Sequence, residues 1–175
     1  MPLILDGTTG IIANNIADYA ISTAKLANSA ITVPKIGYAG AVLQVVAVED
    51  ATLYTTTSTS TWSTIISASI TPSSTSSKIL IFARTGEPDI ATGWGQVRVF
   101  RNATATEVFK LTSEFGRGIT NTSESHYAPI FAAAMDSPAT LSNTTYLLSA
   151  ICGTAGTFRV GNGSKHQITL MEIAG

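Results

Sequence analysis

The sequence predicts an all-β protein, a jelly-roll-like antiparallel β-sandwich at residues 39–175 that follows an extended N-terminal arm at residues 1–38. Nine short segments after residue 40 are rich in β-branched and aromatic residues, and turn-forming residues separate them. No segment of the chain has a helical apolar pattern of useful length. Many short strands with turns between them are typical of antiparallel sandwiches of the jelly-roll type.

The composition also favours strands. Charged residues make up 12% of the chain, about half of the roughly 25% that is usual for globular proteins. Ser and Thr supply about a quarter of the residues, and Thr fits the pleated surface of a sheet well. Because hydroxyl groups are cheaper to desolvate than charged groups, such a surface suits close packing against copies or partners.

The arm contains an imperfect tandem repeat of ten residues, IADYAISTAK at 16–25 and LANSAITVPK at 26–35. Ser22 and Pro34 are suited to begin short helical turns within it. A unit this small buries no core alone, and two copies are too few for a solenoid, so the neighbours are expected from other chains. The apolar residues expected to anchor the arm and to join copies are Leu3, Leu5, Ile11, Ile12, Ile16, Ile21, Leu26, Ile31 and Ile36.

The clearest strand lies in the segment TWSTIISASIT at 61–71. Its period of two predicts that Trp62, Thr64, Ile66, Ala68 and Ile70 face the core, while the intervening hydroxyl residues face solvent. The other predicted strands are 41–49, 77–84, 95–101, 107–111, 126–135, 144–152, 156–160 and 166–173.

Charge and hydropathy exclude several classes of partner. The net charge is -1 and the 10 basic residues are scattered, whereas nucleic-acid binding requires clustered Lys and Arg. No apolar run approaches the roughly 18 residues of a membrane span, and the N-terminus does not resemble a signal peptide. We therefore expect neither a nucleic-acid partner nor membrane insertion. The single Cys152 lies in an apolar run and is predicted to be a buried structural thiol.

The ionisable residues give no catalytic pattern. His126 and His166 each begin a predicted strand and are expected to be turn or edge residues. No nucleophile elbow, calcium-loop spacing or Cys/His cluster is present. The sequence therefore predicts a protein that is not an enzyme and holds no cofactor and no metal ion. A cation on a symmetry axis between chains, bound by one residue from each chain, remains an alternative.

The sequence supports recognition of a ligand better than it supports catalysis or metal binding. Trp94 lies between Gly93 and Gly95, an arrangement that can expose an indole on a loop, and Gln96 follows closely. Aromatic faces stack on sugar rings, and exposed loops on a rigid sandwich often carry binding residues. A second open loop at 115–127 adds polar side chains. The candidate glycan contacts are Trp94, Gln96, Arg117 and Tyr127. The alternative, that Trp94 anchors a core or an interface, also stays open.

Several short motifs resemble bacteriophage proteins. The AIT-x-x-K core of the repeat and the opening LDGTTGI resemble stalk segments of phage fibres. AVLQVV, SITPSSTSSKILI, MDSPATLSNTTYLL and ITLMEIAG resemble short trimeric fibre-like or decoration virion proteins of tailed phages, of the marine and freshwater type. This resemblance spans nearly the whole chain. It implies a homotrimer on the virion surface with an N-terminal attachment arm and a β-rich head, and it supplies no catalytic residues.

These observations predict a non-enzymatic structural protein, a trimeric tail protein or short fibre that docks to other phage structural proteins through its arm. One alternative is a capsid decoration protein, a cement or head fibre, bound to the major capsid protein. Another is a glycan-binding adhesin module that contacts a host surface glycan. A depolymerase is disfavoured because paired carboxylates are scarce.

Overall fold

The protein divides into two units, Met1–Gly37 and Tyr38–Gly175. The computed structural model describes most of the second unit. The described residues are 39–90, 93–104, 106–119, 124–125, 129–153, 156–161 and 163–175, with the backbone alone for 113–119 and 124–125. The arm residues that the sequence predicts to anchor the chain lie outside this part.

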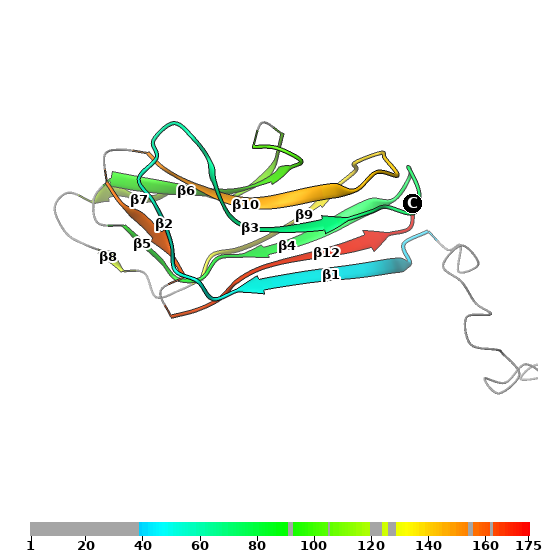
Figure 1. Ribbon diagram of the computed structural model, residues 1–175, viewed down its shortest axis with the longest axis horizontal. Coiled ribbons are helices and arrows are strands. Elements are labelled where there is room, and N and C mark those ends of the chain that lie inside the picture. Colours follow the sequence, from blue (N-terminus) through cyan, green and yellow to red (C-terminus); the bar gives the residue numbers. More distant parts are fainter. Residues whose placement is uncertain are drawn as a thin grey trace, which may run out of the picture. The chain divides into compact units, whose positions relative to one another are not determined.

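All regular elements of the described residues are β-strands, and all of their pairings are antiparallel. The all-β prediction is therefore confirmed (Figure 1). The strands are β1 Val42–Asp50, β2 Tyr54–Thr56, β3 Ser63–Ile70, β4 Lys78–Arg84, β5 Pro88–Ile90, β6 Gly93–Arg101, β7 Glu107–Ile119, β8 Glu124–Ser125, β9 Phe131–Asp136, β10 Thr144–Cys152, β11 Phe158–Val160 and β12 His166–Ile173.

The strands form three four-stranded sheets. We call them the β12 sheet, with order β1-β12-β4-β9, the β10 sheet, with order β3-β10-β6-β7, and the end sheet, with order β2-β11-β5-β8. The β12 and β10 sheets pack face to face in a sandwich-like arrangement, and the end sheet lies at the end away from the C-terminus (Figure 1). The chain crosses between the two large sheets repeatedly, since β1, β4, β9 and β12 belong to one and β3, β6, β7 and β10 to the other.

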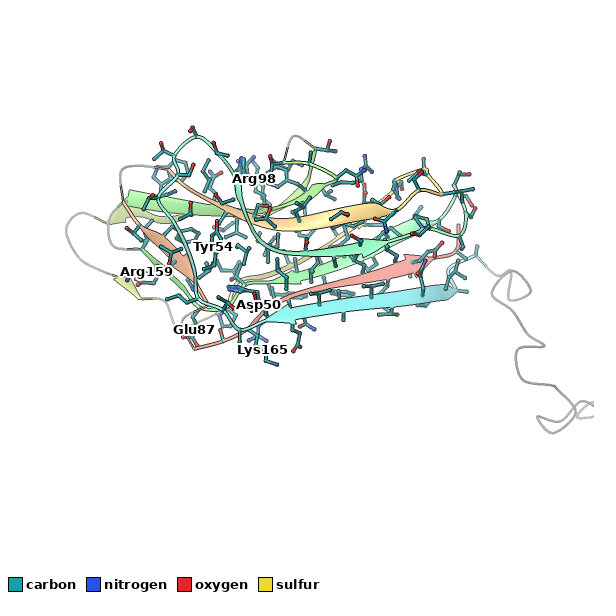
Figure 2. The ribbon with its side chains drawn as sticks, in the orientation of Figure 1. Asp50, Tyr54, Glu87, Arg98, Arg159 and Lys165 are labelled. Carbon is teal, nitrogen blue, oxygen red and sulfur yellow. The ribbon has the colours of Figure 1, made fainter. Side chains whose placement is uncertain are left out.

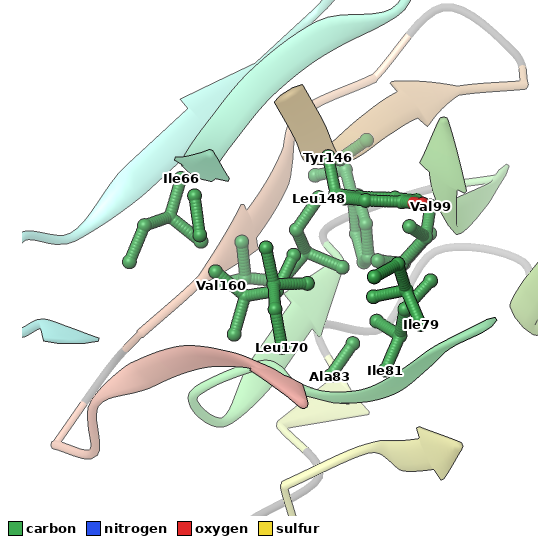
Figure 3. Close-up of a cluster of buried hydrophobic side chains, with 14 of the residues drawn as sticks. Ile66, Ile79, Ile81, Ala83, Val99, Tyr146, Leu148, Val160 and Leu170 are labelled. Carbon is green, nitrogen blue, oxygen red and sulfur yellow. The ribbon is translucent and has the colours of Figure 1, made fainter. Parts of the chain in front are cut away.

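Alternation along the strands produces the core. In β12, Ile168 and Leu170 are fully buried while the residues between them are partly exposed. In β4, Ile79, Ile81 and Ala83 are fully buried by the same period of two. These side chains meet those of β6 and β10 between the sheets (Figure 3). Burial of each large aliphatic side chain is worth about 1.5–3 kcal/mol, so the alternation accounts for the pairing of the two sheets.

The end sheet closes the core at one end. Ile90, Phe158 and Val160 are fully buried there. The Phe158 ring occupies the space beside Gly95, where an added Cβ atom would lie only 2.5 Å from the ring carbon Cγ. Glycine at this position of β6 therefore lets an aromatic ring from the end sheet enter the core.

Each of the nine predicted strands corresponds to an observed strand, with changes at the ends. The strand predicted at 107–111 extends to Ile119, and the one predicted at 126–135 begins only at Phe131. The sequence did not indicate β2, β5 and β8, all of which belong to the end sheet. Two or three residues are too few to display a period of two. The equally short β11 was predicted only as part of the longer segment 156–160.

One predicted face is wrong. Trp62 and Thr64 were expected on the core face with Ile66, yet Thr64 is exposed and Trp62 precedes the strand. The pairing with β10 shifts from Leu148–Ile66 to Ser149–Thr64. Ile65 therefore has no partner in the ladder, and such a bulge reverses which residues face the core on its two sides.

Candidate functional site

The candidate site lies on the outer face of the β10 sheet, along β6. Gly95, Val97 and Val99 face the core, so Trp94 and Gln96 face outward between them. The strand begins at Gly93, which places Trp94 within a strand. The predicted loop location of Trp94 is therefore wrong, whereas Trp94 and Gln96 do share one face.

Trp94 is packed against the backbone of the turn after β10. An added Cβ atom on Gly153 would lie 1.9 Å from the indole Cε2, so the ring rests directly on this glycine. The Gly153 N–H donates a hydrogen bond to the Trp94 carbonyl oxygen at 2.7 Å. The side chain is only partly exposed as a result, unlike the freely exposed indole that a Gly-Trp-Gly loop would present.

Arg98 is the centre of the polar contacts on this face. Its Nη2 donates to Gln96 Oε1 at 2.7 Å, and its Nη1 forms an ion pair with Glu107. The guanidinium carbon lies 4.8 Å from the centre of the Trp62 ring, a cation–π distance. Trp62 in turn meets Phe100 edge-on, with ring centres 5.0 Å apart. Figure 2 shows Arg98 beside the segment that leads from β2 to β3.

We call this group the β6 cluster, defined as Trp62, Trp94, Gln96, Arg98, Phe100 and Glu107. Ser149 of β10 is paired with Arg98 in the ladder and is fully buried. Ser149 Oγ and Arg98 Nε are buried atoms that have no hydrogen-bond partner among the described residues. The cluster therefore combines two indoles and a guanidinium on one side of the sheet, next to the buried hydroxyl of Ser149.

Two of the four predicted glycan contacts cannot be placed in the cluster. Arg117 lies in β7, but its side chain is outside the described residues, and Tyr127 is outside them entirely. The contact of Trp62 with Arg98 could not be predicted, because the bulge at Ile65, which removes Trp62 from the core face, has no signature in the sequence.

Asp136 joins the two large sheets. Arg101 Nη1 of β6 donates to both carboxylate oxygens of Asp136 in β9, at 3.0 and 2.8 Å. The hydroxyl of Tyr146 in β10 donates to the same carboxylate at 2.8 Å. Burial, together with this hydrogen bond to Asp136, raises the pKa of Tyr146 well above its usual range. The group is a structural link, and both oxygens of its carboxylate accept hydrogen bonds from within the fold.

Glu172 is a second internal carboxylate and is fully buried near the C-terminal end of β12. Gln44 Nε2 donates to one oxygen at 2.6 Å, and the Ser73 N–H and hydroxyl both donate to the other at 2.7 Å. Burial by itself would raise the pKa of Glu172, but the hydrogen bonds from Gln44 and Ser73 hold it below its ordinary value. This carboxylate therefore stays ionised and fixes the turn after β3 to β12.

His166 contradicts the sequence prediction. It was expected at a turn or edge, but its side chain is fully buried at the start of β12. Its Nδ1 accepts a hydrogen bond from the Gly86 N–H at 3.0 Å, and Nε2 lies 3.1 Å from the Thr52 carbonyl oxygen, to which it donates. Burial lowers the pKa of His166, so the neutral ring is favoured. His126 lies outside the described residues.

Within the part of the chain that the structure describes, no group of three or more His, Cys, Asp or Glu residues could hold a metal ion. The same residues contain no helix long and apolar enough to cross a membrane. Cys152 is fully buried, as predicted. No protein-family model matches the chain, and no curated protein shows significant similarity to it.

Proposed function

We propose that this chain is a non-enzymatic, homotrimeric structural protein of a bacteriophage virion, a tail protein or short fibre held to the particle by residues 1–38. The strand order carries the proposal. The orders β1-β12-β4-β9 and β3-β10-β6-β7, with the chain alternating between them, suit a jelly roll. Jelly rolls build viral capsid and lectin domains. A fold alone does not assign a function, so the proposal also draws on the N-terminal repeat and on the polar chemistry of the sandwich.

The polar chemistry supports a structural role. Asp136 and Glu172 accept hydrogen bonds from other residues of the sandwich. The ring nitrogens of buried His166 contact the backbone of two loops, at Gly86 and Thr52. Each of these groups thus has a structural partner that explains its presence. The repeat at 16–35 gives the chain a segment whose apolar side requires neighbours from other chains.

Deletion of residues 1–36 tests the anchoring role. We expect the truncated chain to keep its strand content by circular dichroism and to be lost from purified particles of the encoding phage, because the apolar residues of the arm would be missing. Immunogold electron microscopy of intact particles measures this and also distinguishes a tail location from the capsid location of a decoration protein. Particles that carry the truncated chain at normal levels would contradict the anchoring role.

The β6 cluster favours a second candidate function, recognition of a host surface glycan. Trp94 and Gln96 share an outward face of β6, and the Arg98 guanidinium lies beside Gln96 on the same face. A glycan array is expected to show binding that Trp94→Ala abolishes and that Leu141→Ala, at an exposed residue between β9 and β10, leaves unchanged. An array without signal for the native chain would contradict this candidate.

A further inference from the structure

The outer face of the β12 sheet is apolar across all four strands. The register places one residue of each strand side by side in two adjacent rows, both without a charged side chain. The first row is Val45, Met171, Leu80 and Met135, and the second is Ala47, Thr169, Phe82 and Ala133. We call these two rows with Phe131 the β12 face.

Large side chains of this face are exposed. Val45 is 54% exposed, Met135 50% and Phe131 59%. Phe131 stacks on Phe82 of the neighbouring strand, with ring centres 6.1 Å apart, so the two rings form one raised aromatic area. Contiguous exposed apolar surface of this kind marks an interaction site more often than a solvated surface.

The opposite outer face of the sandwich shows what a solvated face of this chain is like. On β3, Ser67 and Ser69 are exposed, and Ser69 shares a hydrogen bond with Thr145 of β10. Glu107 and Lys110 are exposed on β7. At these positions the β10 sheet therefore presents hydroxyl and charged groups beside the indoles of the β6 cluster, while the β12 sheet presents aliphatic, thioether and aromatic groups.

Charges occur only around the apolar rows. The next row along the strands contains Glu49 and Arg84, on β1 and β4. Glu49 forms an ion pair at 2.8 Å with Lys165, which is labelled in Figure 2. An apolar centre with a rim of both charge signs is the usual anatomy of a protein interface. Because both signs are present, the faces of copies arranged around a three-fold axis do not repel one another.

The area of the face suits contacts among the three copies of a trimer. Strands about 4.8 Å apart with a rise of about 3.4 Å per residue give the two apolar rows, which span four residues on each of four strands, a flat area of roughly 260 Å². With the flanking rows that carry the charged rim, seven residues on each strand give roughly 450 Å², so three such faces around one axis would together remove about 1,300 Å² from water.

We propose that the β12 face is the surface through which copies of this chain contact one another. This inference rests on the proposed association of copies and adds the surface that they use. The chain leaves the N-terminal unit directly into β1, the first strand of this sheet, and the Ala174 N–H donates to the Ala41 carbonyl oxygen at 2.8 Å beside it. Copies joined through the repeat would hold their β12 sheets at high effective concentration.

The shape of the face also fits a second copy. Phe82 lies between the small residues Thr169 and Ala133 in its row, so raised rings alternate with shallow positions. One copy can place its aromatic pair over the alanine positions of the next, and flexible Met135 and Met171 can fill the remaining gaps. The assembly would thereby cover the exposed apolar area of each chain.

The test uses the full chain with lysines on the β12 face. Val45→Lys with Met135→Lys is expected to weaken self-association at least about a hundredfold, because each lysine would bring an unpaired charge into the apolar contact. The matched control, Thr64→Lys with Ser67→Lys, places the same charges on exposed positions of β3 and should leave the association unchanged. Sedimentation velocity over a concentration series measures both, and circular dichroism checks that each variant is folded.

Thiol labelling gives a second readout that does not depend on the lysine variants folding. In the native assembly, a maleimide should react with Met135→Cys at least about tenfold more slowly than with Ser67→Cys, since access governs thiol reactivity. If the two labelling rates are equal and the lysine variant still forms the native oligomer, the β12 face is not the contact between copies. That result would leave the trimer proposal standing. A full chain that stays monomeric would overturn both, while immunogold labelling would still decide the virion location.

Discussion

Phe158→Ala is expected to lower the free energy of unfolding of the sandwich by about 3–5 kcal/mol, the usual cost of truncating a buried aromatic side chain. Phe158 is fully buried and fills the space beside Gly95, where the end sheet meets β6. Urea unfolding followed by intrinsic fluorescence measures the change.

Gly95 provides the matched test of this packing. An added methyl group at residue 95 would lie 2.5 Å from the Phe158 ring, so Gly95→Ala should destabilise the protein by about 1–3 kcal/mol through overpacking. In the Phe158→Leu background the same substitution should cost clearly less, because the smaller side chain leaves room. Equal costs in the two backgrounds would show that the ring does not occupy this space.

Glu172→Gln is expected to destabilise the sandwich by about 2–4 kcal/mol at pH 7, because an amide presents its own N–H groups to donors that need an acceptor. Gln44 and both donors of Ser73 point at this carboxylate, and Glu172 is fully buried. Urea unfolding at pH 7 measures the loss. Glu49→Gln, which removes an exposed carboxylate, serves as the control and should have a small effect.

The pH dependence of Glu172 has a definite sign. Its pKa is held below the ordinary value of 4.5, so its stabilisation is present above that value and is lost as the pH falls through the lower pKa of the folded state. Between pH 7 and pH 3 the native chain should therefore lose more stability than Glu172→Gln does. Parallel pH profiles for the two proteins would contradict the role assigned to this carboxylate.

Much of the sandwich could be predicted from local patterns. The period of two in HQITLMEI places Glu172 in phase with Ile168 and Leu170, so its burial was readable from the sequence even though its partners were not. Gln44 and Ser73 lie 128 and 99 residues away, and only the assembled sheets bring them together. The same holds for Asp136, whose donors come from β6 and β10.

The candidate site was predicted less well. Trp94 and Gln96 share a face because both lie in β6, but the Gly93-Trp94-Gly95 sequence suggested a loop. In the structure Gly95 makes room for Phe158 and Gly153 makes room for Trp94. Neither close approach has a local signal, since each joins residues more than fifty positions apart. The β12 face depends on register across four strands, which a single strand pattern does not reveal.

We expect this chain to work as an assembly of identical copies. The decisive measurement is the mass of the full 175-residue chain of 18.2 kDa in solution, by sedimentation equilibrium or mass photometry. We expect a single species with the mass of three chains at micromolar concentration. A stable, folded monomer under the same conditions would contradict it.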